Sequence, residues 1–87
     1  MCTYNTEKVE IAGSGKGTQG WFQLTDATVY FDHPVHAMAE HTLNIDFRNP
    51  AQGAAARVAV ELTAESARAL AAAIEAALAA VPAALTS

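Results

Sequence analysis

The chain has 87 residues, 52% of them hydrophobic, and a formal net charge of -4 at pH 7. This length allows one domain, residues 1–87, with a thin core, because alanine inflates the hydrophobic share and buries little area per residue. The basic residues are scattered singly and form no stripe that could follow a phosphate backbone, so we expect no nucleic-acid partner; they are Lys8, Lys16, Arg48, Arg57 and Arg68.

The composition also bears on the cellular location of the protein. Cys2 is the single cysteine, so an internal disulfide is excluded, and the N-terminus lacks the basic and apolar regions of a signal peptide. The most apolar segment, Ala69 to Leu85, contains Glu75 and Pro82 and falls short of a membrane span. We therefore predict a cytoplasmic protein with no membrane partner.

The first half of the chain alternates in the manner of strands. Residues 6–11 place Val9 and Ile11 on one face, which predicts a half-buried strand, and a glycine-rich segment then interrupts it. Residues 21–24 and 28–31 are extended segments, either one strand bent near Thr25 or two strands. The sheet therefore has four strands, or five.

The glycine-rich segment, Gly13 to Gln19, resembles the core of the phosphate-binding loop of adenylate kinases. That motif requires a strand before it and a helix after it, whereas here it leads into the extended Gly20-Trp21-Phe22. Glu10 also stands where the motif has its first glycine. We interpret the segment as a flexible glycine hairpin without a nucleotide.

Two clearer strands follow. Residues 41–48 place Leu43, Ile45 and Phe47 on one side, and residues 57–62 alternate again after a turn at residues 49–53. Alternating strands joined by short turns and followed by one helix predict an α+β fold. In this fold the C-terminal helix packs on the apolar face of an antiparallel sheet.

The helix begins after Thr63, a suitable N-terminal cap, and its apolar residues recur at helical spacing until Pro82 ends it. Its polar surface is small for a solvated helix. The alanine-rich side therefore either meets a second subunit, giving a homodimer, or reflects a bias toward alanine.

All three histidines, His33, His36 and His41, lie within nine residues, flanked by Asp32 and Glu40. Imidazole binds zinc, copper, iron and nickel, and carboxylates coordinate directly or orient the rings. The cluster is therefore a candidate site for a divalent transition metal.

Strand parity gives the cluster a geometry. His33 continues the face of Phe31 and His41 that of Leu43, so pairing Phe31 with Leu43 sets both histidines opposite each other, pointing inward. His36, in the connecting loop, would then be the third ligand. Three imidazoles with an open fourth position are typical of a catalytic metal.

Cys2 could instead close the metal shell as a thiolate, although parity leaves it on the other face of its strand. Two alternatives need no metal. In one, a histidine oriented by Asp32 or Glu40 acts as an acid or base, and in the other the histidines are hydrogen-bonded residues at the rim of the core.

A second candidate site lies on the other face of the sheet. Tyr30, Asn44 and Asp46 occupy outward positions of neighbouring strands, close to Arg48 and Arg57. Such a mixture of aromatic, carboxylate and guanidinium groups can contact a polar small molecule, although a face of this kind is more often merely solvated.

The helix and five other segments, Met1–Tyr4, Gly13–Gly17, Tyr30–Ala37, Glu40–Phe47 and Ala56–Leu62, carry a resemblance that spans nearly the whole chain. In these segments the chain resembles a family of short, uncharacterised actinobacterial proteins that is defined as a domain of unknown function. The resemblance implies a bacterial cytoplasmic protein and transfers no substrate or catalytic residue.

Two functional hypotheses follow from these patterns. The leading hypothesis is a small metal-binding protein that uses His33, His36 and His41, extending to a metalloenzyme that acts on a small molecule. The alternative is a non-catalytic small-ligand-binding or homo-oligomeric module with incidental histidines.

Overall fold

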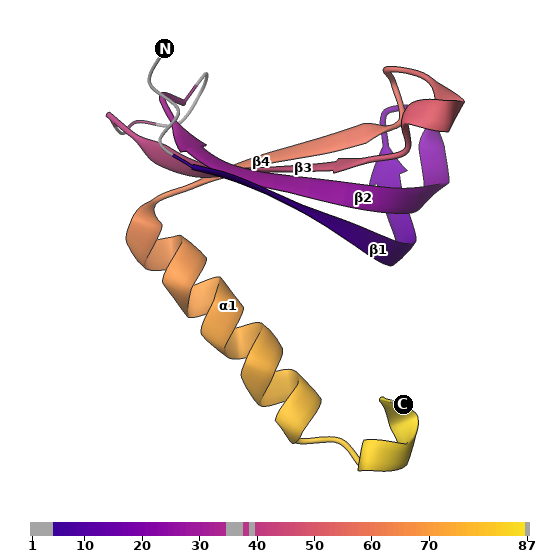
Figure 1. The fold of residues 1–87 in the computed structure, drawn as a ribbon, viewed down its shortest axis with the longest axis vertical. Helices are drawn as coiled ribbons and strands as arrows, with labels where there is room; N and C mark the ends of the chain where they lie inside the picture. The colour runs from indigo at the N-terminus through magenta and orange to yellow at the C-terminus, as the bar shows by residue number, and fades with distance from the viewer. Residues whose placement is uncertain (1–4, 35–37, 39, 87) are drawn as a thin grey trace.

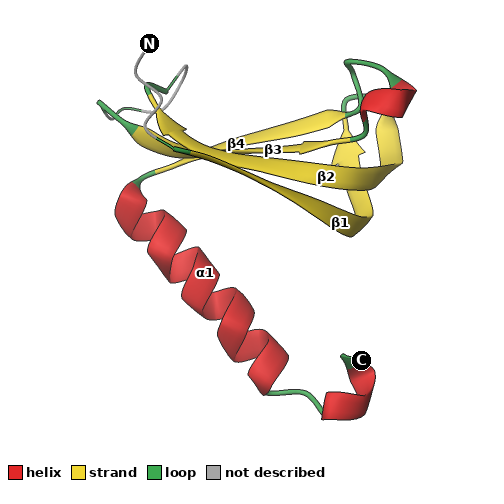
Figure 2. Ribbon diagram, viewed as in Figure 1, coloured by secondary structure: helices red, strands yellow, loops and turns green. Residues whose placement is uncertain are grey.

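The structure, a computed structural model, describes residues 5–34, 38 and 40–86. Within these residues it contains four strands, one α-helix and two short 3-10 turns at Pro50–Gln52 and Ala83–Leu85 (Figures 1 and 2). The strands pair antiparallel in chain order to form one open sheet. The elements are β1 (Thr6–Gly17), β2 (Gly20–Asp32), β3 (Thr42–Arg48), β4 (Arg57–Leu62) and α1 (Ala64–Ala79). The predicted α+β fold is confirmed with four strands.

Strand β2 is one continuous strand of 13 residues, which removes the option of a fifth strand. It pairs with β3 so that Phe31 lies opposite Leu43 and Val29 opposite Ile45, the register that parity predicts. The odd-numbered residues of β2 and β3 therefore share one face of the sheet, and the even-numbered residues share the other.

The glycine-rich segment continues strand β1 and only its last two residues, Thr18 and Gln19, form the turn. A Cβ at Gly15 would lie 3.2 Å from the Leu24 side chain, so the missing side chain lets the opposite strand pack closely. Gly20 has a φ of 106°, which favours glycine at the end of the turn. The segment forms a hairpin, as expected, but not a separate loop.

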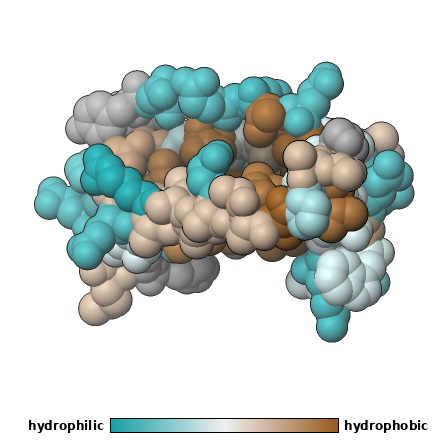
Figure 3. Space-filling view, turned by 90° about the horizontal axis from the view of Figure 1, so that it is seen from below, coloured by the Kyte–Doolittle hydropathy of each residue, from teal (hydrophilic) through white to brown (hydrophobic). Residues whose placement is uncertain are grey.

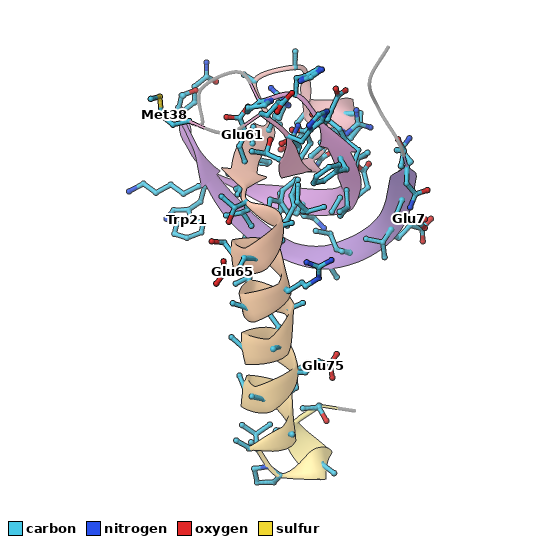
Figure 4. All side chains as sticks on the ribbon, turned by 90° about the vertical axis from the view of Figure 1, so that its left-hand side faces the viewer. Glu7, Trp21, Met38, Glu61, Glu65 and Glu75 are labelled. Atoms are coloured by element: carbon cyan, nitrogen blue, oxygen red, sulfur yellow. The ribbon has the colours of Figure 1, made fainter. Side chains whose placement is uncertain are left out.

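The sheet is strongly curved. A register shift between Glu10 and Gly13 bends the β1–β2 hairpin, in keeping with the twist that a β-bulge introduces. Figure 4 shows side chains crowded inside the curve, on the side away from α1. We call this even-numbered side the concave face, and the odd-numbered side, which α1 contacts, the convex face.

Helix α1 begins against the convex face and then leaves it. The Thr63 side chain accepts a hydrogen bond from the Ser66 amide at 3.1 Å and so caps the first turn, as predicted. The helix touches β3 and β4, after which Figure 1 shows it extending away from the sheet. Ile74 remains 52% exposed and Leu78 54%.

The thin core is confirmed, because the buried hydrophobic residues among those described are only Leu24, Ala27 and Ala56.

Candidate functional site

The end of β2 and the start of β3 bring two of the three histidines together. Asp32 and Thr42 form the last pair of the β2–β3 ladder, so His33 and His41 follow it directly on opposite strands. Their rings stack with centroids 4.5 Å apart and planes 28° apart. The His41 ring also stacks on Phe31, at 5.8 Å and 10°. The parity argument therefore located this histidine pair correctly.

Two hydrogen bonds hold His33 in place. Its backbone N–H donates to Oδ1 of Asp32 at 2.7 Å, and its ring nitrogen Nδ1 lies 2.9 Å from the carbonyl oxygen of Glu40. A carbonyl can only accept a hydrogen bond, so this contact requires a proton on Nδ1, and in the neutral ring the lone pair is then on Nε2. Both flanking acidic residues thus orient His33, Asp32 through its side chain and Glu40 through its backbone.

The expectation that both rings point into the core was wrong for His33, which is exposed, whereas His41 is half-buried. The reason is that the paired ladder ends at Asp32, and the convex face that α1 covers lies farther along the strands. His33 therefore lies at the open end of the sheet, within reach of solvent.

The remaining predicted metal ligands, His36 and Cys2, lie outside the described residues. Among the residues that the structure does describe, no group of three or more His, Cys, Asp or Glu side chains converges as a metal site. The described part of the cluster is thus a pair of imidazoles with supporting hydrogen bonds.

The second candidate site forms a connected network on the concave face. Asp46 accepts hydrogen bonds from Arg57 Nη2 at 2.7 Å and from the Tyr30 hydroxyl at 3.3 Å. Two residues farther along the β2–β3 ladder, on the same face, Arg48 Nε donates to Oδ1 of Asp26 at 3.0 Å. Residues predicted from parity alone are therefore linked by their side chains across three strands.

The network alters the acidity of Tyr30. Burial raises the pKa of its hydroxyl above the ordinary value of 10.0, and the negative charge of Asp46 and the hydrogen bond to that carboxylate raise it further. The positive charge of Arg57 and a hydrogen bond with Asn44 lower the pKa, but they do not outweigh these three effects. Tyr30 is therefore a neutral hydrogen-bond donor at physiological pH.

The concave face is less solvated than the sequence suggested. Asn44 is 6% exposed and Thr42 fully buried, and Oγ1 of Thr42 donates to Oδ1 of Asn44 at 2.6 Å. Curvature explains the difference, because the bent hairpin turns toward this face. Asn49 Nδ2 donates to the carbonyl oxygen of Gln23 at 2.9 Å and so links the β3–β4 connection to β2 on this side. Thr42 was missed as a member of the network, although it shares the parity of Asn44.

A pocket of about 280 Å³ lies at the end of this network, between the β3–β4 connection and two arginines, Arg48 and Arg57. These arginines form a cross-strand pair, an arrangement that like charges normally disfavour. Asp26 and Asp46 each neutralise one of them. The pocket is therefore a small cavity with guanidinium groups in its wall.

Comparison with known proteins places the chain in a family. A family model described as a family of unknown function (DUF6295) matches residues 1–87, the whole chain. The chain belongs to this family. No curated protein and no solved structure matches it. Within the described residues of this family member, no helix is sufficiently long and apolar to cross a membrane.

Proposed function

We propose that the protein binds a divalent transition-metal ion through His33 and His41. The observation that carries the proposal is the stacked ring pair, in which His33 already holds its Nδ1 proton on the Glu40 carbonyl. Metal-binding histidines commonly donate one ring N–H to a carbonyl or carboxylate and bind the ion with the other nitrogen. His33 has that arrangement before any metal is bound.

The distance between the rings suits a shared ion. Two imidazole nitrogens around one zinc ion, each at about 2.0–2.1 Å, lie about 3.3 Å apart in tetrahedral geometry. The rings are stacked, with centroids 4.5 Å apart and a 28° tilt, so one ring would turn out of the stack to aim its lone pair at the same ion as the other. Exposed His33 can make that rotation without disturbing the core.

Zinc, copper, iron and nickel all fit an imidazole pair. His36 stays a prediction as the third ligand, with Asp32 and Glu40 as neighbouring carboxylates. A catalytic role for the metal would need that third protein ligand together with an open position for substrate. The bacterial cytoplasm is the setting that the resemblance implies, and it likewise stays part of this proposal.

Metal content and affinity test the proposal. Purified protein reconstituted with zinc, nickel or copper should retain about one equivalent per site, measured by elemental analysis, and should bind by calorimetry at micromolar concentration. His33→Ala and His41→Ala should each weaken binding at least roughly tenfold, as loss of a ligand does. Binding should also weaken in acidic buffer, because imidazole must be unprotonated to coordinate.

Phe31→Leu is the matched control, because it removes the ring that stacks on His41 without removing a nitrogen donor. This variant should bind metal as the unaltered protein does. A separate His36→Ala variant reports whether the third histidine contributes. Absence of stoichiometric metal after reconstitution, or an affinity in both histidine variants that is unchanged from the unaltered protein, would contradict the proposal.

The second candidate function is binding of a small anionic molecule on the concave face. The pocket beside Arg48 and Arg57 supports it, because a guanidinium has five N–H donors and only one nitrogen of each contacts its aspartate. A thermal-shift screen with small carboxylates and phosphates tests it. A hit that Arg57→Ala abolishes and His33→Ala leaves intact would support this site, whereas no stabilisation by either class would exclude it.

A further inference from the structure

The convex face and helix α1 enclose an apolar cleft that the chain itself leaves open. The cleft has a volume of about 340 Å³ and lies between sheet residues, including Val29 and Ile45, and helix residues, including Leu70 and Ile74. Figure 3 views the molecule from below and shows apolar residues in the middle of this face, with polar residues toward the edges. We propose that α1 of a second copy of this chain fills the cleft, antiparallel to the first helix, in a two-fold symmetric dimer.

The exposed area of the chain is too large for a compact monomer. A folded chain of 9.1 kDa is expected to expose about 4,900 Å². This chain exposes 6410 Å², an excess of about 1,500 Å². Its radius of gyration is 14.4 Å, against about 12 Å for a compact domain of this length. The projecting helix, whose Leu70, Ile74 and Leu78 are exposed, contributes to both differences.

The excess matches what an obligate dimer buries. Two copies together would remove about 3,000 Å², which lies within the range of roughly 2,000–5,000 Å² for obligate homodimer interfaces. Interfaces of this class are also the most apolar. The area therefore favours a permanent partner over a transient one.

The composition of α1 favours a helix as the occupant. Of its 16 residues, three are charged and one is serine, and the remainder are Ala, Leu or Ile. A helix that is apolar on nearly all sides is normally buried. In the dimer, α1 of each copy would lie between α1 and the sheet of the other copy, and would so be covered on several sides. The result is a layered arrangement of sheet, two helices and sheet.

The charges on α1 fix the relative direction of the two helices. Ala67, Ala71, Ile74 and Leu78 recur at alternating spacings of four and three, which forms one stripe along the helix. Arg68 and Glu75, seven residues apart, lie along the same edge of that stripe. In an antiparallel pair whose axes cross between these two positions, Arg68 of each copy lies beside Glu75 of the other.

A parallel two-fold pair would instead place this edge of the two helices on opposite flanks of the interface, where Arg68 of one copy does not meet Glu75 of the other. The antiparallel crossing point also falls at Ala71 and Ala72, whose small side chains allow a short distance between the helix axes. Charge and size therefore select the same geometry.

Charge reversal combined with a mass measurement tests this interface. Sedimentation equilibrium on the full chain should give about twice the 9.1 kDa of one copy at micromolar concentration. Arg68→Glu and Glu75→Arg should each raise the dimer dissociation constant at least roughly tenfold, because like charges then face each other twice. The double variant carrying both changes should recover the dimer.

Mixing the two single variants gives the sharpest result. A copy with two acidic positions and a copy with two basic positions should form a heterodimer that is tighter than either homodimer. A defect in folding cannot explain such recovery, since both altered chains are still present in the mixture. Glu65→Arg, a charge reversal on the opposite side of the helix, is the matched control and should leave the mass unchanged.

A monomeric mass for the unaltered chain would overturn the proposal, and so would a mixture that stays as dissociated as the single variants. Circular dichroism should show that α1 stays helical in each variant at concentrations where its dimer persists. The metal proposal stands or falls separately, because none of these substitutions removes a histidine.

Discussion

Replacing Asp46 should both destabilise the fold and change the acidity of Tyr30. In Asp46→Ala, the Tyr30 hydroxyl and Arg57 lose the carboxylate that both contact. A half-buried hydroxyl left without an acceptor costs about 1–2 kcal/mol. The ion pair adds less than about 1 kcal/mol, because the Arg57 side chain is 50% exposed. We therefore expect a loss of about 2 kcal/mol in the free energy of unfolding.

Asp46→Asn is the matched variant, since it keeps the size and an acceptor oxygen while removing the charge. It should cost about 1 kcal/mol, and it should lower the pKa of Tyr30, because the Asp46 charge raises that pKa. Arg57→Ala should do the opposite and raise it, because the guanidinium charge lowers the Tyr30 pKa. The two variants therefore shift one titration in opposite directions.

Urea unfolding followed by circular dichroism at one protein concentration measures the stability loss. Absorbance of the phenolate as a function of pH measures the titration, and Tyr30→Phe identifies which of the two tyrosines is responsible. Equal stability of Asp46→Ala and the unaltered protein would refute the network. Movement of the Tyr30 pKa in the same direction in both charge variants would refute its electrostatic basis.

Two further predictions concern the turn and alkaline stability. Gly20→Ala should cost about 1–3 kcal/mol in urea unfolding, because Gly20 has a φ of 106°; Gly13→Ala, where a Cβ meets nothing within 4 Å, should be near neutral, and equal effects would contradict the backbone argument. The raised pKa of Tyr30 means that the folded state holds the phenolic proton more tightly than the unfolded state, so this stabilisation is complete below pH 10.0 and is lost as pH rises through the folded value. Thermal unfolding in alkaline buffers should therefore decline less steeply in Tyr30→Phe than in the unaltered protein, and identical slopes would contradict the assignment.

The strands, their faces and the register were predictable because each depends on local alternation. Leu43, Ile45 and Phe47 mark one side of β3, and the pairing of Phe31 with Leu43 follows from the same period of two. Once that pairing is known, the neighbouring positions of His33 and His41 are determined. This is why the sequence could locate the histidine pair.

The curvature of the sheet was not predictable in the same way. It depends on the register shift between Glu10 and Gly13 and on close packing of Leu24 against Gly15, features of the hairpin that the alternation of apolar residues does not encode. Curvature in turn decides that Thr42 and Asn44 are buried while Val9, on the apolar side, remains 52% exposed. The tautomer of His33 was equally hidden, because it depends on a backbone carbonyl that no side-chain pattern encodes.

The proposed sites lie in different parts of the fold, so their tests can be read independently. The Tyr30–Asp46–Arg57 network occupies the concave face, whereas the proposed dimer interface occupies the convex face and α1. The histidine pair follows the last pair of the β2–β3 ladder, near the start of α1, while Figure 1 shows the space between helix and sheet widening toward the other end. A histidine variant should therefore leave the mass unchanged, and Arg68→Glu should leave metal affinity unchanged. If metal instead changed the mass, the ion would be shared between copies, and His33, which is exposed, would belong to an interface that the convex face alone does not explain.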